Sequence, residues 1–296
     1  MIGQQQKDQA EKWFKDLRDK ICKEFEILEE DHLKLAPKSD VAAKKFERKS
    51  TIRETDDKED GGGGVMATLK GGRIFEKVGV NVSAVYGNLA PEAQKSITAR
   101  KAIPELKDDP RFWASGISLV AHMRNPHTPA IHLNTRMFWT PHAWWFGGGT
   151  DLNPSIENDD DTNFFHQILK KKCDKHNQSY YKKFKEWADE YFFIPHRKVA
   201  RGVGGIFFDD LCTGEWEKDF SFTRDVGEAF LEAYIPIVKK NYLKDWTPQD
   251  KTIQEQKRGL YAEFNLVYDR GTKFGLQTGH NIDAVLMSLP PTAEWV

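Results

Sequence analysis

The sequence predicts a single α+β domain in which one large antiparallel sheet carries helices on both faces. Three observations predict it. Segments in the first half alternate apolar and polar residues and follow one another closely, which favours antiparallel pairing of neighbouring strands. Longer segments with apolar residues at helical spacing stand at the N-terminus and in the second half. The 296 residues contain no internal repeat and no strong domain boundary, so we treat residues 1–296 as one domain.

The first 64 residues are expected to hold a long helix and then a flexible loop. Apolar residues share one helical face over residues 4–30, which predicts an amphipathic helix. Residues 39–64 are charged and end in an acidic run and four glycines, so we expect a flexible loop there. The glycine run lacks the Gly-Lys-Ser/Thr ending of a phosphate-binding loop, which argues against a nucleotide site.

The remaining elements follow from the period and length of the apolar patterns. Alternation from Val78 to Ala84 predicts a half-buried strand. Further strands are expected at residues 116–122, 131–139, 143–146, 206–208, 261–268 and 284–289. Two helices are expected over residues 163–193 and one over residues 223–240. Another begins at Thr247 and Pro248, a capping residue followed by proline at the first helical position.

Composition and charge exclude several classes of protein. Hydrophobic residues make up 39% and charged residues 30%, which is typical of a globular protein. A net charge of -1 gives no bulk attraction to nucleic acid or to an anionic membrane. Three distant cysteines without a CxxC pair favour a reducing compartment over a disulfide framework. No apolar run reaches the ~18 residues of a membrane span, and the N-terminus lacks signal-peptide features. We therefore expect a cytoplasmic protein with neither a nucleic-acid partner nor a membrane span.

The strand expected at residues 131–139 presents a row of polar side chains. His132, Asn134 and Arg136 are two residues apart, so an extended chain points them to one face. The expected strand before it repeats the pattern with Ser118 and His122. Two such neighbouring strands can line the floor of a polar pocket. The alternative is the solvated face of an edge strand.

Cations gather between residues 185 and 210. This segment passes from an aromatic-rich helix through His196, Arg197 and Arg201 to a short apolar strand that ends in two carboxylates. Cations held at the start of a buried strand suit an anion-binding pocket. The alternative is a surface loop with solvated arginines.

Carboxylates stand at two other points of interest. Residues 144–151 place aromatic residues before a glycine bend and Asp151, which allows a backbone to approach a ligand. The alternative there is a packed aromatic corner in which Asp151 caps the next turn. Asp269 and Arg270 close the strand expected at residues 261–268, and this acid–base pair is either structural or catalytic.

Taken together, these segments resemble the oxygen-dependent coproporphyrinogen III oxidases of haem biosynthesis. The matching blocks are NVSAVYG at 81–87, SLVAHMRNPHTPAIHLNTR at 118–136, WWFGGGTDLNP at 144–154, KEWADEYFFIPHRKVARGVGGIFFDD at 185–210, EFNLVYDRGTKFGLQTG at 263–279 and LMSLPP at 286–291. They stand in the family's order and cover most of the chain after residue 60. The chain departs from the pattern at Ala188, where cysteine is usual, at Val199, where glutamate is usual, and at Asn281, where bacterial relatives carry arginine.

The resemblance implies a fold, a substrate and a reaction. Members of the family are homodimers of one α+β domain whose antiparallel sheet lies between helices. Their substrate, coproporphyrinogen III, is a flexible reduced tetrapyrrole with four propionate arms. The reaction converts two of these arms into vinyl groups, consumes molecular oxygen and releases carbon dioxide and peroxide. Family members resemble cofactor-independent oxidases, so no cofactor is expected beside the oxygen.

The resemblance also implies roles for individual residues. His132 matches the family's proposed proton donor, and Asp151 fits the carboxylate that accepts hydrogen bonds from the pyrrole N–H groups. We add Asp269 and Arg270 to the catalytic set. The residues that match proposed substrate contacts are Ser118, Asn134, Thr135, Arg136, Gly279, His280 and Asn281. The propionate arms call for arginines, and the candidates are Arg136, Arg197, Arg201 and Arg270.

Four histidines match residues proposed as metal ligands in bacterial members of the family. They are His122, His132, His166 and His196. Because neither HxH nor HExxH occurs, their spacing is not that of a recognised metal site, and we favour an enzyme without metal. Two alternatives stay open at this point: a metal-dependent tetrapyrrole oxidase that uses these histidines, and a non-catalytic tetrapyrrole-binding protein.

Overall fold

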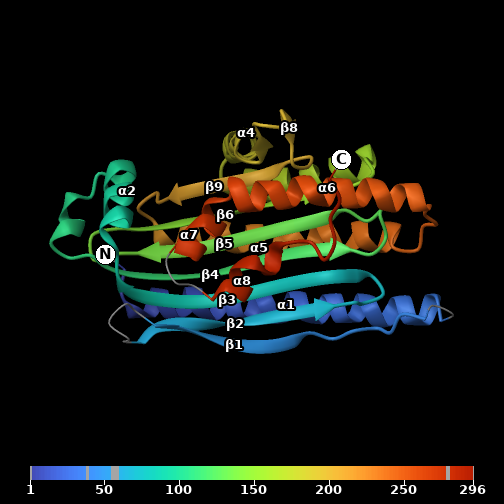
Figure 1. Cartoon of the computed structure of the whole chain (residues 1–296). Helices are drawn as coiled ribbons and strands as arrows, with labels where there is room; N and C mark the ends of the chain where they lie inside the picture. The colour runs from blue at the N-terminus through green and yellow to red at the C-terminus, as the bar shows by residue number, and fades with distance from the viewer. Residues whose placement is uncertain (1, 38–39, 55–59, 278–280, 296) are drawn as a thin grey trace.

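The protein is built around one antiparallel sheet. Its structure is a computed structural model that describes residues 2–37, 40–54, 60–277 and 281–295. Within these residues, seven strands pair in the order β1-β2-β3-β4-β5-β6-β9, and every neighbouring pair is antiparallel (Figure 1). The strands are β1 (Glu47–Glu54), β2 (Asp60–Lys70), β3 (Phe75–Asn88), β4 (Arg111–Met123), β5 (Ala130–Trp139), β6 (Trp144–Asn153) and β9 (Gly205–Leu211). A separate small hairpin joins β7 (Phe193–Ile194) and β8 (Val199–Ala200).

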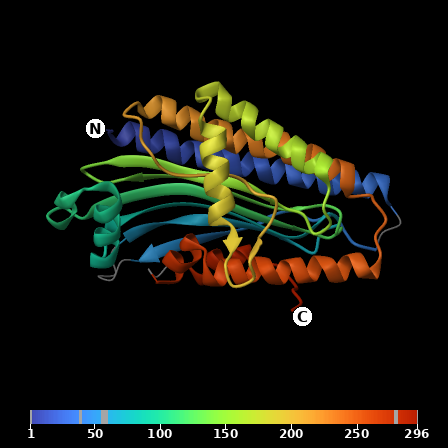
Figure 2. The same cartoon turned by 90° about the horizontal axis from the view of Figure 1, so that it is seen from above.

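Helices cover both faces of the sheet, as the sequence predicts. The helices are α1 (Gln4–Leu35), α2 (Pro91–Lys101), α3 (Asp159–His176), α4 (Tyr180–Tyr191), α5 (Trp216–Asn241), α6 (Pro248–Val267), α7 (Arg270–Gln277) and α8 (Ile282–Val285), with short 3-10 turns at η1 (Pro104–Lys107) and η2 (Leu286–Ser288). Helices α1, α3 and α5 lie together along one face, and α6 and α7 lie on the other (Figure 2). Helix α4 crosses the sheet at its β9 edge.

The main apolar core lies between the sheet and the layer of α1 and α5. Phe25 of α1 stacks on Phe75 of β3 with ring centroids 4.3 Å apart, and Phe230 and Tyr234 of α5 pack beside them. Each of these side chains is fully buried, and such burial stabilises the folded state by roughly 1.5–3 kcal/mol per side chain. The opposite face carries two smaller apolar clusters, which include Trp145 of β6 and Phe207 of β9.

A buried carboxylate ties α1 to the turn between β2 and β3. Glu29 is fully buried and accepts hydrogen bonds from the backbone N–H groups of Arg73, Ile74 and Phe75 at 2.7, 2.8 and 3.0 Å. The apolar pattern predicts that the helix ends at residue 30, but it runs to Leu35. Beyond residue 30, His32 is buried and accepts a hydrogen bond from Arg73 Nε at 3.1 Å, which ties the last turns to the same loop.

Most of the expected elements are confirmed. The strands expected at residues 116–122, 131–139 and 206–208 fall within β4, β5 and β9, and the alternating segment from Val78 to Ala84 falls within β3. The strand expected at residues 143–146 is the start of β6, which begins one residue later and is longer than predicted. The two helices expected over residues 163–193 are α3 and α4, and the helix expected over 223–240 is α5. Thr247 caps α6 as predicted, since its side chain accepts from the backbone N–H of Asp250.

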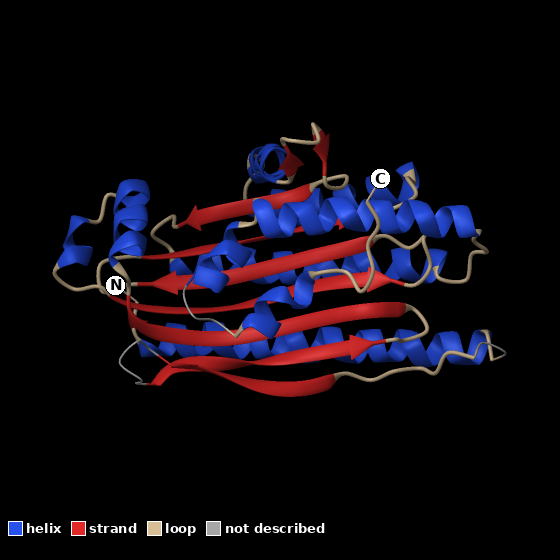
Figure 3. Ribbon diagram, in the orientation of Figure 1, coloured by secondary structure: helices blue, strands red, loops and turns tan. Residues whose placement is uncertain are grey.

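The loop expected at residues 39–64 is a wrong prediction over most of its described part. Residues 47–54 form β1, and residues 60–64 begin β2. Gly63 pairs with Ile52 of β1 and Ala84 of β3, and Gly64 pairs with Thr51 of β1 and Ser83 of β3. The ladder of backbone hydrogen bonds needs no side chain, so a glycine run between two strands pairs readily. Figure 3 shows this part of the sheet continuing the layer without interruption.

Two other expected strands are helical. Residues 261–268 belong to the last turns of α6 and its C-cap, and residues 284–289 lie in α8, η2 and the residue that follows. In α6 the buried residues Tyr261, Phe264 and Asn265 recur at helical spacing, whereas Leu266 and Val267 are exposed. The apparent alternation covered only eight residues, too few to separate the two periods.

Helix α2 was not predicted, because its residues show little amphipathic pattern and only Ile97 is buried. Within the described residues, no helix combines the length and apolar character needed to cross a membrane.

Candidate active site

The polar row on β5 lies on the sheet face that α6 covers. His132, Asn134 and Arg136 are partly exposed, while the residues between them are buried on the opposite side. β5 is paired with β4 and β6, so it is an interior strand, and the alternative of a solvated edge strand is wrong. Thr135 is fully buried on the opposite face, so it is separated from this polar row by the sheet itself.

Sheet register brings polar residues of neighbouring strands beside this row. Ser118 of β4 is directly opposite Asn134, and Asp151 of β6 is directly opposite His132. Directly opposite residues of an antiparallel pair point to the same face, with Cβ atoms ~5 Å apart. The prediction that two adjacent strands share one polar face is therefore confirmed for Ser118 and Asn134.

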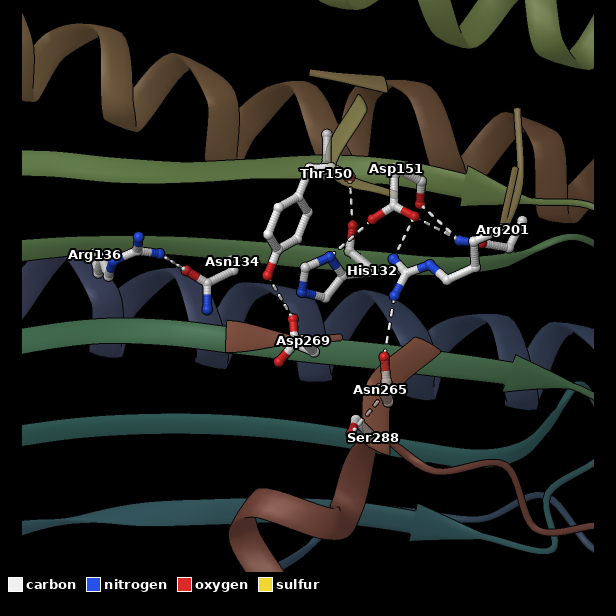
Figure 4. A network of polar contacts seen from close by, with 11 residues as sticks. His132, Asn134, Arg136, Thr150, Asp151, Arg201, Asn265, Asp269 and Ser288 are labelled. Atoms are coloured by element: carbon white, nitrogen blue, oxygen red, sulfur yellow. Dashed lines mark hydrogen bonds and ion pairs between the residues drawn. The ribbon is translucent and has the colours of Figure 1, made fainter. Parts of the chain in front are cut away.

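His132, Asp151 and Arg201 form a buried network (Figure 4). His132 Nδ1 lies 2.8 Å from Asp151 Oδ1, and Arg201 Nη2 donates to Asp151 Oδ2 at 2.6 Å. Asn153 Nδ2 also donates to Oδ2, at 2.9 Å. The Asp151 side chain is 1% exposed and the Arg201 side chain 2%. Asp151 thus sits within a strand, engaged at both oxygens, and the alternative that it caps a turn is wrong.

The charges in this network fix the protonation of the carboxylate. Burial acts to raise the pKa of Asp151, but the attraction of Arg201 and the hydrogen bond from His132 outweigh it and lower the pKa to about 2. Asp151 is therefore ionised at neutral pH. Because an ionised carboxylate only accepts, His132 must carry its proton on Nδ1, which leaves Nε2 as the atom that gains or loses a proton.

Arg201 is held by aromatic rings rather than by solvent. Its guanidinium carbon lies 4.3, 4.5 and 4.6 Å from the ring centroids of Phe192, Tyr261 and Phe264. Its Nη1 also donates to Asn265 of α6 at 3.1 Å. This enclosure fits a counter-ion for Asp151 and leaves Arg201 poorly placed for a substrate propionate.

A second ionic group lies further along β5. Arg136 donates to Asn134 Oδ1 at 3.0 Å and pairs with Asp209 of β9 at 2.9 Å. Arg270 at the start of α7 lies 3.9 Å from the same carboxylate. Asp269 caps α7 by accepting from the backbone N–H of Thr272, and it also accepts from the hydroxyl of Tyr191. The structure thus brings Arg136 and Arg270, two of the four arginines named as candidate propionate clamps, to one carboxylate. The roles assigned to them stay predictions.

The four histidines expected as an alternative metal site have separate surroundings. Burial lowers the pKa of His122 to about 3, and its Nε2 lies 2.9 Å from the carbonyl oxygen of Ser288. His166 contacts the carbonyl oxygen of Val203. His196 contacts Glu263 and Tyr268, while His132 contacts Asp151. Among the described residues, no three His, Cys, Asp or Glu side chains are grouped to hold a metal ion. The residues present therefore do not fit a metal centre of these four ligands.

The other predicted contacts lie elsewhere or outside the described residues. Arg197 of the exposed hairpin makes a bidentate pair with Glu263 of α6 at 2.6 and 3.0 Å. It is thus at the surface, as the alternative has it, but it is ion-paired rather than merely solvated. Asn281 caps α8 by accepting from the backbone N–H of Ala284. Gly279 and His280 lie outside the described residues. Ala188, where the family usually has cysteine, is fully buried in α4, and Val199 is exposed.

The sequence prediction missed two charged residues of this face. Asp209 was visible only as one of two carboxylates that end the 206–208 strand, and Arg100 stands on the helix that was not predicted. The two residues form an ion pair with each other, although they are far apart in the sequence, and Arg100 Nη1 lies 3.4 Å from Asp209 Oδ2.

One face of the sheet carries a partly exposed histidine bound to a buried carboxylate, together with half-exposed arginines. This arrangement is typical of an enzyme site for an anionic ligand. Comparison with known proteins agrees with this class. The family model for coproporphyrinogen III oxidase matches residues 9–296. The oxygen-dependent coproporphyrinogen-III oxidase of Rickettsia bellii (strain RML369-C) is 47% identical over 99% of this chain and 100% of its own length. The protein of the same name from Rickettsia peacockii (strain Rustic) is 48% identical over 98% of each chain. The chain belongs to the coproporphyrinogen III oxidase family.

Proposed function

We propose that this protein catalyses the oxygen-dependent oxidative decarboxylation of coproporphyrinogen III to protoporphyrinogen IX in haem biosynthesis. One observation supports it above the others: the ionised Asp151 fixes His132 in one tautomer on the same strand face as Arg136. A proton-transfer group thus lies four residues from an arginine that suits a propionate. The near-full-length similarity to proteins of that name gives the substrate and the oxidant.

The reaction balances without a prosthetic group. Each reacting propionate loses carbon dioxide and a hydride equivalent from the carbon beside the pyrrole, which leaves a vinyl group. Molecular oxygen accepts the two electrons and, with one further proton, becomes hydrogen peroxide. Two arms react, so two molecules of oxygen are consumed for each substrate. The protein's contribution is to orient the ring, place charge beside it and move protons.

The geometry suggests a division of work among the site residues. His132 exchanges a proton through Nε2, and Asp151 with Arg201 holds its tautomer and orientation. Arg136 and Arg270 bind propionate groups. Ser118 and Asn134 line the sheet beneath the ring. The contacts expected of Gly279, His280 and Asn281 stay predictions.

The deciding experiment compares incubation with coproporphyrinogen III in air and without oxygen. We expect protoporphyrin fluorescence after oxidation of the product, formed only in air, with two oxygen molecules consumed per substrate. His132→Asn should lower kcat by about 10²–10⁴ because the transferable proton is lost. His142→Asn is the matched control, since His142 is exposed in the turn between β5 and β6.

The same assay separates the remaining alternatives. Tight binding of the porphyrinogen without oxygen uptake would indicate a carrier, and loss of activity on chelation with recovery on added metal would indicate a metal-dependent oxidase. A cytoplasmic homodimer with no cofactor beside oxygen belongs to this proposal. Its oligomeric state can be measured by light scattering coupled to size-exclusion chromatography.

A further inference from the structure

Three arginines from three different elements converge on one buried carboxylate. Asp209 of β9 is 5% exposed, and its partners are Arg136 of β5 at 2.9 Å, Arg100 of α2 at 3.4 Å and Arg270 of α7 at 3.9 Å. The three arginine side chains are 35%, 38% and 50% exposed. The Asp209 carboxylate therefore lies beneath the three guanidinium groups, which are open to solvent.

The pair between Arg136 and Asp209 spans an intervening strand. β6 lies between β5 and β9, and the residue of β6 opposite Arg136 is Gly147. A Cβ atom at Gly147 would come within 2.7 Å of Asp209 Oδ1 and 3.1 Å of Arg136 Cζ. The ion pair thus occupies the space that any other side chain at this position would need.

A local irregularity of β9 aims the carboxylate at that space. Gly148 pairs with Phe208 but Phe146 pairs with Leu211, so Asp209 and Asp210 together stand against Gly147. This bulge is accommodated at Asp210, whose φ of 59° lies in the left-handed region. A non-glycine residue in that conformation is strained and persists when the surrounding contacts hold it.

The cluster carries more positive charge than its own carboxylates neutralise. Arg100 also pairs with Asp210 at 3.1 Å, and Lys101 lies 3.5 Å from the same carboxylate. Three arginines and one lysine therefore share the two carboxylates of Asp209 and Asp210, which leaves two positive charges in excess. Arg270 is also fixed by rings, since its guanidinium carbon lies 4.9 Å from the Tyr191 ring centroid and 5.7 Å from that of Phe207. Ordered, half-exposed guanidinium groups with uncompensated charge are suited to bind a further carboxylate.

We infer that Asp209 is a positioning residue that gathers Arg100, Arg136 and Arg270 into a subsite for a carboxylate of the substrate. Arg136 is four residues from His132 along β5, which corresponds to roughly 13 Å. A ligand with several carboxylate arms can anchor one arm here while another part of the ring reaches His132. The inference rests on the proposed function for the identity of that arm, a propionate.

The decisive variant is Asp209→Asn, because two roles of Asp209 predict opposite signs. Removing its negative charge makes the site more positive, so if Asp209 only neutralised charge, an anionic substrate would bind more tightly and KM would fall. If Asp209 positions the arginines, they lose their common partner, and KM should rise about tenfold or more with kcat changed far less. An unchanged or lowered KM would overturn the inference.

Two further variants keep the test decisive if Asp209→Asn does not fold. Arg270→Gln and Arg100→Gln change half-exposed side chains, and each should raise KM with little change in kcat. An unchanged KM in both variants would exclude the subsite. Asp225→Asn is the matched control, since Asp225 is also buried and paired, with Lys175 and His176, but lies in the helical layer on the other side of the sheet.

A binding titration separates failure of this inference from failure of the proposed function. The probe is oxidised coproporphyrin III, a stable tetracarboxylate, followed by its fluorescence. If the wild-type protein binds the probe but turns over no porphyrinogen, the proposed function is wrong. In that case the subsite still stands if Asp209→Asn weakens binding of the probe. If turnover occurs and Asp209→Asn leaves both Kd and KM unchanged, only the subsite is wrong.

Discussion

Asp151 and Asp209 stand on neighbouring strands of one sheet face, and each is paired with arginine, but the two ion pairs differ in what surrounds them. The partner of Asp151 is enclosed by three aromatic rings and has almost no exposed surface. The arginines around Asp209 are each at least one-third exposed. The buried Arg201 directs its donors at Asp151 and Asn265 inside the protein, whereas a half-exposed arginine keeps donors for a ligand.

The difference separates chemistry from binding within one site. The enclosed pair keeps Asp151 ionised and thereby sets the tautomer of His132. The open cluster is expected to attract and orient a carboxylate arm. Variants of the enclosed pair should therefore change kcat and stability, and variants of the open cluster should change KM.

The largest expected effect comes from Asp151→Asn. The neutral asparagine amide binds the His132 imidazole more weakly than the ionised carboxylate does. It also leaves the charge of Arg201 without a negative partner. We expect kcat to fall by about 10²–10⁴, with a smaller change in KM. Asp225→Asn, which breaks another buried Asp–His pair on the far layer, should leave kcat close to the wild-type value. Wild-type turnover in Asp151→Asn would refute the role assigned to this carboxylate.

Arg201→Met tests the enclosed pair from its other side. Methionine removes the charge but keeps much of the volume among Phe192, Tyr261 and Phe264, so the loss is mainly electrostatic. An unpaired buried Asp151 should cost about 3–5 kcal/mol of unfolding free energy. Urea unfolding at neutral pH measures this directly, and a loss below about 1 kcal/mol would show that water reaches the pair.

Acid should weaken the fold through Asp151. Its folded-state pKa of about 2 lies below the ordinary value of 3.8, so its stabilising contribution is complete above pH 4 and is lost as pH falls through 2. The contribution is on the order of 2 kcal/mol. Unfolding free energies between pH 4 and pH 2 should therefore fall more steeply in the wild-type protein than in Asp151→Asn. Parallel curves would contradict the assignment.

The smallest expected effect concerns Arg197, a sequence-based candidate for a propionate clamp. Arg197 lies on the exposed hairpin, and its guanidinium is bound in bidentate fashion by Glu263 of α6. Arg197→Gln should change KM by less than about twofold, since an exposed ion pair contributes little and lies apart from the polar face of β5. A large rise in KM would show that the hairpin moves toward the substrate.

The sheet and its polar row were predictable because they depend on local periodicity. Alternation in residues 131–139 places His132, Asn134 and Arg136 on one face whatever the neighbours are, since successive side chains of a strand point to opposite sides. The same rule separates Thr135 from that row, although the resemblance had grouped it with the substrate contacts. Short segments were less secure: residues 261–268 alternate, yet they continue a helix that Thr247 begins.

What the sequence by itself determined is the set of elements whose patterns are long enough to read, the alternating strands and the amphipathic helices. The motifs that run along those elements also indicated the family. Only the tertiary structure decided which charges meet. Arg136 and Asp209 are brought together by the register of three strands and by the missing side chain of Gly147, and Arg100 joins them from a helix with little pattern of its own. The physical reason is that side-chain direction is a local property of the backbone, whereas an ion pair across a sheet depends on how distant segments align.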